Sequence, residues 1–129
     1  MVRAGPLACL ALSVLVLAEA VDKYEEGRFA HINVDEVLGN QRILGSFIKC
    51  FLDEGPCTAD SRDMKKLLPE VIDSKCERCT DNQKKMMAKA VKHVKDNRPD
   101  DWERLTNKYD PDHTKTEDID KFISDALAM

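Results

Sequence analysis

Four cysteines mark the central stretch "CFLDEGPCTADSRDMKKLLPEVIDSKCERC", residues 50–79, with the spacing C-x6-C-x18-C-x2-C. Closely spaced cysteines of this kind can bind zinc, form a redox-active dithiol or form structural disulfides. The compartment in which the chain folds decides among these three chemistries, and the N-terminus indicates that compartment.

The first 20 residues, "MVRAGPLACLALSVLVLAEA", have the layout of a secretory signal peptide. Arg3 precedes an apolar run from Leu7 to Ala18, and the segment ends in a small-x-small triplet. The apolar run is shorter than the roughly 20 residues that a membrane-spanning helix needs. We therefore predict a signal peptide over residues 1–20, a secreted, extracellular domain over residues 21–129, and no membrane insertion.

Removal of this segment changes the composition very little but changes the cysteine count. Of 129 residues, 109 remain (129 − 20), which suits one small domain. Arg3 and Glu19 leave together, so the net charge stays at −4. Cys9 leaves as well, so five cysteines become four. An even number of cysteines in an oxidising compartment predicts two disulfides.

Zinc and redox chemistry fit these four cysteines less well. Structural zinc sites usually draw on two close pairs, whereas six residues separate Cys50 from Cys57. A thioredoxin-like dithiol would follow a strand, and no strand pattern precedes Cys76 and Cys79. Four cysteines can pair in three ways, and the spacing by itself leaves all three open.

Apolar residues recur with a helical period along most of the predicted mature chain. This pattern predicts four amphipathic helices and two shorter ones, over Ile43–Leu52, Met64–Ile72, Met86–Val94, Ile119–Leu127, Val34–Leu38 and Trp102–Tyr109. Glycine, proline and aspartate break the pattern at 53–57, 96–101 and 110–113. We therefore expect one compact all-α domain of six helices.

Several functional classes find little support in the sequence. None of the three histidines stands in a recognisable catalytic motif, so we do not expect an enzyme. Residues 110–121 resemble a calcium loop at their first and third positions, but Lys115 and Lys121 occupy positions that need glycine and glutamate. We interpret this segment as a loop and helix cap, and we expect neither a metal ion nor a cofactor.

Lysines cluster at 65–66, at 84–85 and again between 89 and 95. Their spacing suits the solvated faces of two helices, and acidic residues are interleaved with them. Because the chain as a whole is acidic, we do not expect it to bind nucleic acid.

The cysteine pattern and its surroundings resemble the insect chemosensory proteins, also called OS-D-like proteins. The stretches "CFLDEGPCT", "MKKLLPEVI", "CERCTDNQK" and "WERLTNKYDP" carry the resemblance, which extends over residues 31–122. It implies a six-helix, all-α fold around an apolar channel, with two local disulfides, Cys50–Cys57 and Cys76–Cys79. It also implies a non-enzymatic carrier of small hydrophobic molecules, such as semiochemicals or fatty-acid-like chains, involved in odorant or pheromone binding and transport.

The inward stripes of four helices, together with this resemblance, provide candidate ligand contacts. The candidates are Leu44, Phe47, Leu68, Val71, Met87, Val91, Trp102 and Tyr109. Phe47 stands where members of the family commonly have tyrosine, so we expect ligands to be held by apolar burial with little pairing of a head group. We expect a monomer. The alternative hypothesis is a non-sensory developmental or immune role through a protein partner.

Overall fold

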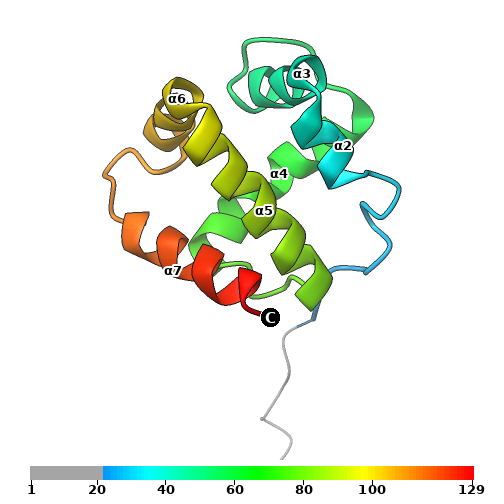
Figure 1. The fold of residues 1–129 in the computed structure, drawn as a ribbon, viewed down its shortest axis with the longest axis vertical. Helices are drawn as coiled ribbons and strands as arrows, with labels where there is room; N and C mark the ends of the chain where they lie inside the picture. Colours follow the sequence, from blue (N-terminus) through cyan, green and yellow to red (C-terminus); the bar gives the residue numbers. More distant parts are fainter. Residues whose placement is uncertain (1–21) are drawn as a thin grey trace, which may run out of the picture.

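The structure, a computed structural model, describes residues 22–129, and in that range it contains six helices and no strand (Figure 1). The helices are α2 (Val34–Gly39), α3 (Gln41–Phe51), α4 (Ala59–Ser74), α5 (Asp81–Asn97), α6 (Pro99–Tyr109) and α7 (Thr116–Leu127). The predicted all-α fold of six helices is thus confirmed. The predicted signal peptide over residues 1–20, with its Cys9, lies outside the described residues.

Both disulfides are local, as the family resemblance implied. They join Cys50 to Cys57 and Cys76 to Cys79, with Cα–Cα distances of 5.0 and 5.1 Å. The first closes the turn between α3 and α4, and the second closes the turn between α4 and α5. A covalent bridge therefore stands at each end of α4.

A capping threonine directly follows the second cysteine of each pair. The hydroxyl of Thr58 accepts from the Ser61 amide, and the hydroxyl of Thr80 accepts from the Gln83 amide. In both cases the threonine amide donates in return to the side chain of the third helical residue, which completes a capping box. Capping by these threonines thus defines where α4 and α5 begin, directly after the second cysteine of each disulfide.

The turn after α4 is unusually sharp. Lys75 and Cys76 both have left-handed backbone conformations, with φ of 57° and 61°. The amide of Cys76 donates to the carbonyl of Val71 at 2.8 Å, which closes the end of the helix. A left-handed residue other than glycine costs roughly 1–2 kcal/mol, so two in succession depend on the contacts that hold this turn, including the Cys76–Cys79 bridge.

The connection between α5 and α6 is shorter than the broken pattern at 96–101 suggested. Only Arg98 lies between the two helices, and Pro99 occupies the first position of α6. The Arg98 guanidinium donates to the carbonyl of Gln41 at 2.9 Å and to the carboxylate of Asp101 at 3.1 Å. This single residue ties the corner between α5 and α6 to the start of α3.

Helix α5 crosses the middle of the molecule and packs against α2, α6 and α7 (Figure 1). The core contains two buried clusters. One consists of Tyr24, Val71, Cys76 and Cys79, and the other consists of Leu44, Ile48 and Val94. The Cys76–Cys79 bridge is therefore part of the apolar core as well as a staple of the turn.

The N-terminal segment is anchored by Tyr24, which is buried against this disulfide. Its amide donates to the carbonyl of Arg78 at 2.8 Å, and its hydroxyl donates to the Glu70 carboxylate, also at 2.8 Å. The Arg78 guanidinium lies 4.7 Å from the centre of the Tyr24 ring and donates to Glu70 at 2.9 Å. These contacts join the start of the described chain to the end of α4.

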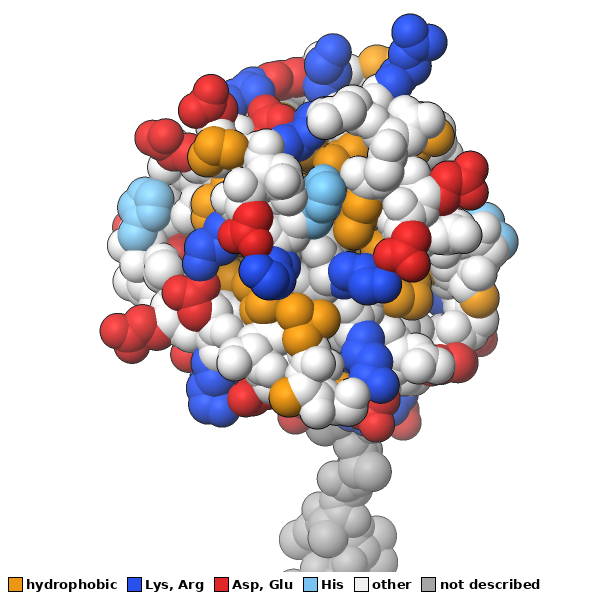
Figure 2. All heavy atoms as spheres, viewed as in Figure 1, with side chains coloured by type: hydrophobic (Ala, Val, Ile, Leu, Met, Phe, Trp, Pro, Cys, Tyr) orange, Lys and Arg blue, Asp and Glu red, His pale blue; other side chains and the backbone are white. Residues whose placement is uncertain are grey.

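On the face shown in Figure 2, positive and negative side chains are interspersed, with apolar side chains visible between them. None of the helices within residues 22–129 combines the length and the apolar character that crossing a bilayer requires.

Replacing the bridge in the core, Cys76→Ala with Cys79→Ala, should lower the free energy of unfolding by roughly 2–4 kcal/mol, to which loop closure contributes about 2 kcal/mol. Urea denaturation measures this loss. The Tyr24 amide, whose acceptor Arg78 lies inside the bridged ring, should also exchange faster with solvent. In the matched variant Cys50→Ala with Cys57→Ala, we expect destabilisation but slow exchange at Tyr24. Unchanged exchange in the first variant would contradict this account.

The Tyr24 contacts also predict a pH dependence. Hydrogen bonds from Arg78 and then Tyr24 lower the pKa of Glu70 from its ordinary value of 4.5. Burial, followed by the bond to Glu70, raises the pKa of Tyr24 above 10.0. Because the pKa of Glu70 is lower in the folded state than in the unfolded state, the ionised carboxylate stabilises the fold. This stabilisation is complete above pH 4.5 and is lost as the pH falls through the lowered pKa. The stabilisation by the neutral Tyr24 phenol is complete below pH 10.0 and is lost as the pH rises through the raised pKa of that phenol.

Glu70→Gln should therefore melt at a lower temperature than the wild type near neutral pH, and the two proteins should converge as the pH falls through the lowered pKa of Glu70. Thermal unfolding followed by circular dichroism measures both. Glu103→Gln, on the exposed surface of α6, serves as the control and should keep the wild-type pH profile. A difference between Glu70→Gln and the wild type that persists undiminished at low pH would exclude titration of Glu70 as its source.

Candidate ligand-binding cavity

An apolar cavity of about 260 Å³ lies between the helices and contacts both buried clusters. Residues from each of the six helices line it, and the lining from α2, α3 and α5 consists entirely of apolar side chains. A cavity with such a wall offers almost no hydrogen-bond partners to water, so it favours an apolar guest.

All eight candidate residues from the sequence lie on the cavity wall. They are Leu44 and Phe47 of α3, Leu68 and Val71 of α4, Met87 and Val91 of α5, and Trp102 and Tyr109 of α6. The structure thus brings together residues that are up to 65 positions apart (109 − 44). Their contact with a bound ligand remains a prediction.

Two further helices contribute wall residues outside the eight candidates. Helix α2 supplies Val34, Val37 and Leu38, and α7 supplies Ile119 and Phe122. These residues belong to apolar stripes that are visible in the sequence, but a stripe does not distinguish a solid core from a cavity wall. Cys76 also lines the cavity, a position that no periodic pattern could have indicated.

Trp102 has two roles in the geometry. It packs against the cluster of Leu44, Ile48 and Val94, and it also lines the cavity. On the neighbouring wall, the rings of Phe47 and Phe51 lie 6.1 Å apart between centroids and are tilted by 59°. Trp102 and the two phenylalanine rings all line the cavity, so a ligand that enters it would change the surroundings of these aromatic side chains.

Hydroxyl groups on the α6 wall are already engaged by the protein. The Tyr109 hydroxyl donates to the carbonyl of Phe51 at 2.6 Å, and the Thr106 hydroxyl donates to the carbonyl of Trp102 at 2.6 Å. Burial raises the pKa of the Tyr109 phenol, an effect that the nearby Lys108 partly offsets. Both donors are thus committed to backbone carbonyls, which leaves this part of the wall apolar in practice.

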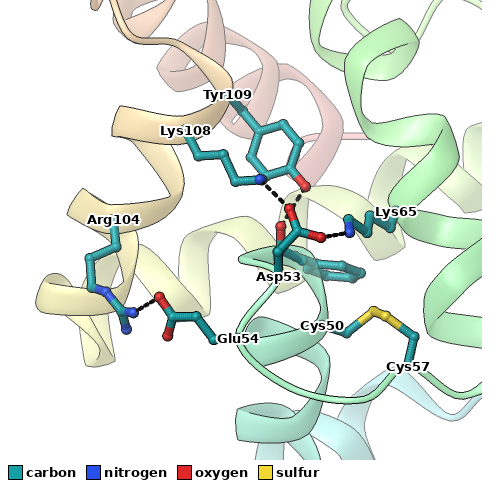
Figure 3. A network of polar contacts seen from close by, with 9 residues as sticks. Cys50, Asp53, Glu54, Cys57, Lys65, Arg104, Lys108 and Tyr109 are labelled. Carbon is teal, nitrogen blue, oxygen red and sulfur yellow. Dashed lines mark hydrogen bonds and ion pairs between the residues drawn. A yellow bond between two sulfur atoms is a disulfide. The ribbon is translucent and has the colours of Figure 1, made fainter.

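Ion pairs to two helices, α4 and α6, hold the loop between α3 and α4 (Figure 3). Asp53, with a left-handed φ of 61°, accepts from Lys65 of α4 and from Lys108 of α6. Glu54 accepts from Arg104 of α6. Together with the Cys50–Cys57 bridge, these pairs fix the loop between α4 and α6, next to the Tyr109 bond.

Charged side chains on the wall are confined to one side of the cavity, which we call the charged rim and define as Lys75, Asp110, Lys115 and Asp118. They come from the end of α4, the turn between α6 and α7, and the first turn of α7. Asp110 is buried and accepts from the amides of Thr114 and Lys115, both at 3.1 Å. The first residue of the calcium-like segment therefore caps a turn, in line with its interpretation as a loop and helix cap.

Residues 24–117 match the profile described as "Insect pheromone-binding family, A10/OS-D". Ejaculatory bulb-specific protein 3 of Drosophila melanogaster is 40% identical over 105 residues, which are 80% of this chain and 82% of that protein.

Two solved structures share the fold. A chemosensory protein in complex with bromo-dodecanol has 31% identity and a TM-score of 0.70, and the match covers 77% of this chain and 98% of that chain. The antennal chemosensory protein A6 from the moth Mamestra brassicae has 32% identity and a TM-score of 0.62, with 74% and 93% covered.

The Tyr109 geometry predicts that its hydroxyl stabilises the fold and does not contact ligand. Tyr109→Phe should lower the free energy of unfolding by about 1 kcal/mol, because the Phe51 carbonyl loses its donor. Its affinity for an alkyl alcohol should stay within about twofold of the wild type. Denaturation and probe displacement measure the two quantities. A large loss of affinity with unchanged stability would indicate that the hydroxyl binds the ligand directly.

Proposed function

This chain belongs to the insect pheromone-binding family A10/OS-D, and we propose that it is a secreted, monomeric carrier of small hydrophobic molecules, which it holds by their alkyl chains inside the cavity. The candidate ligands are semiochemicals and fatty-acid-like or other alkyl compounds. In this proposal the protein binds and transports its ligand without catalysing a reaction on it.

The observation that carries the proposal is the cavity wall. Apolar side chains from α2, α3 and α5 form one continuous part of it, and the hydroxyls of α6 are occupied by backbone carbonyls. Each buried methylene contributes about 0.8 kcal/mol, which lies below the ceiling of about 1.5 kcal/mol per non-hydrogen atom that the best small ligands reach. A chain of about ten carbons can therefore reach micromolar affinity from apolar burial alone.

A related structure supports the same interpretation. The chemosensory protein that shares this fold was solved with bromo-dodecanol, a long-chain alcohol with one small polar group. Such a molecule matches the chemistry of the present cavity, in which apolar surface dominates and charge is confined to one side.

The proposed role does not require a sensory organ. One relative is named as specific to the ejaculatory bulb, whereas a structural neighbour is named as antennal. Carriage of an apolar molecule in a non-sensory tissue is therefore the second candidate role. It uses the same cavity, and tissue-specific expression separates it from a sensory role.

If apolar burial dominates binding, affinity should rise about three- to fourfold for each added methylene until the cavity is filled. A titration series of primary alcohols followed by Trp102 emission measures this slope, because Trp102 lines the cavity. Trp102 is the single tryptophan of the chain, so the signal has one source. Affinity that does not vary with chain length would contradict the proposal.

A variant that fills the cavity provides the control. Ala90 of α5 lines the wall, and Ala90→Phe should weaken binding of the longer alcohols by at least about tenfold, since space for two or more methylenes is lost. Ala128→Phe, at an exposed position after α7, should bind as the wild type does. Circular dichroism checks that both variants retain the helical fold.

A further inference from the structure

We propose that the cavity binds its ligands in one orientation and prefers an anionic head group, a carboxylate, which Lys75 and Lys115 hold at the charged rim. This inference rests on the proposed carrier function and adds to it the class of head group and the residues that recognise it. The alkyl tail then extends from the rim toward the apolar wall of α3 and α5.

The first argument is the asymmetry of the wall. Among the described residues that line the cavity, the four charged ones come from the segment after α4, from the turn between α6 and α7 and from the first turn of α7. Helices α2, α3 and α5 contribute none. A polar head placed against those three helices would lose hydration without gaining a partner, which is unfavourable. The rim is therefore the side of the cavity at which a charged head can be satisfied.

The second argument is the different state of Asp110 and of the two rim lysines. Asp110 is only 5% exposed, and its two carboxylate oxygens accept from the amides of Thr114 and Lys115. Its negative charge is thus already satisfied by backbone donors. The ammonium groups of Lys75 and Lys115, by contrast, pair with carboxylates near the surface, while the aliphatic stems of the two lysines contribute to the almost wholly apolar wall.

The ion pairs of the two lysines are loose. Lys75 lies 3.4 Å from Asp118, and Lys115 lies 3.6 Å from Asp73, which is outside the cavity lining. The other lysine–carboxylate pairs are shorter, for example 2.8 Å for Lys89–Asp35 and 2.6 Å for Lys92–Asp96.

The acidic partners are also accessible to solvent. The side chain of Asp118 is 46% exposed and that of Asp73 is 73% exposed, so either can be hydrated when its lysine turns to a ligand. Pairs of this kind contribute little to stability and are readily exchanged. A ligand carboxylate can therefore replace Asp118 or Asp73 as the acceptor for these ammonium groups.

The solvent exposure of the two lysines determines how strongly they can favour a carboxylate over a neutral head group. The Lys75 side chain is 62% exposed and that of Lys115 is 31% exposed, so water and salt screen both charges. We expect the two lysines together to favour a carboxylate roughly three- to tenfold over a neutral head of equal chain length. The alkyl chain still supplies most of the affinity.

The test compares dodecanoic acid with its methyl ester and with dodecanol, near neutral pH and low salt. Wild-type protein should bind the acid roughly three- to tenfold more tightly than the two neutral compounds. In the variant Lys75→Met with Lys115→Met the preference should disappear, while the affinities for ester and alcohol stay within about twofold. Lys66→Met, an exposed lysine of α4 away from the lining, should behave as the wild type does.

Equal affinity of the wild type for acid, ester and alcohol would overturn the inference and leave the carrier function standing. A double variant that loses affinity for all three compounds equally would also overturn it, since the lysines would then act on the cavity as a whole. Failure of every compound to bind would instead contradict the proposed function. If the double variant does not fold, Lys75→Met alone, at the more exposed site, decides the question by the same comparison.

Discussion

The two disulfides at the ends of α4 are the constraint on which the rest of the structure depends. Cys57 directly precedes the cap of α4, and Cys76 lies just beyond its end. Each bridge closes a ring too short to contribute more than about 2–2.5 kcal/mol through chain entropy, so their main effect is geometric. They determine where α3 ends and where α5 begins relative to α4. Because Cys76 also lines the cavity, the same constraint reaches the candidate site.

Short polar contacts hold the remaining connections around the cavity. Asp53 and Glu54 tie the first disulfide loop to α6, Arg98 ties the corner of α6 to α3, and Tyr24 ties the N-terminal segment to the end of α4. Most of these contacts are exposed to solvent, where each is worth little by itself. Distributed around the periphery, they keep the helix ends in place while the space between the helices stays open.

The chemistry of the wall follows from this arrangement. Hydroxyls that would otherwise face a guest donate to backbone carbonyls of α3 and α6, and the charged residues stand together at the rim. We propose that apolar contact sets how long a ligand can be and that the rim sets which end of the ligand stays near water. A carrier with these properties discriminates by chain length first and by head group second.

The eight residues that now stand on the cavity wall followed from the apolar stripes of four helices together with the family resemblance. The six helices, their apolar stripes and most of the turns between them could be predicted from the sequence alone. These features depend on helical periodicity, caps and breakers, which are properties of neighbouring residues. The disulfide pairing followed from the family pattern. Only the tertiary structure decided that Tyr24 is buried, that α2 and α7 complete the wall, and that Asp53 pairs with Lys108, 55 residues away. These contacts join distant segments and depend on how the helices cross, which no local pattern encodes.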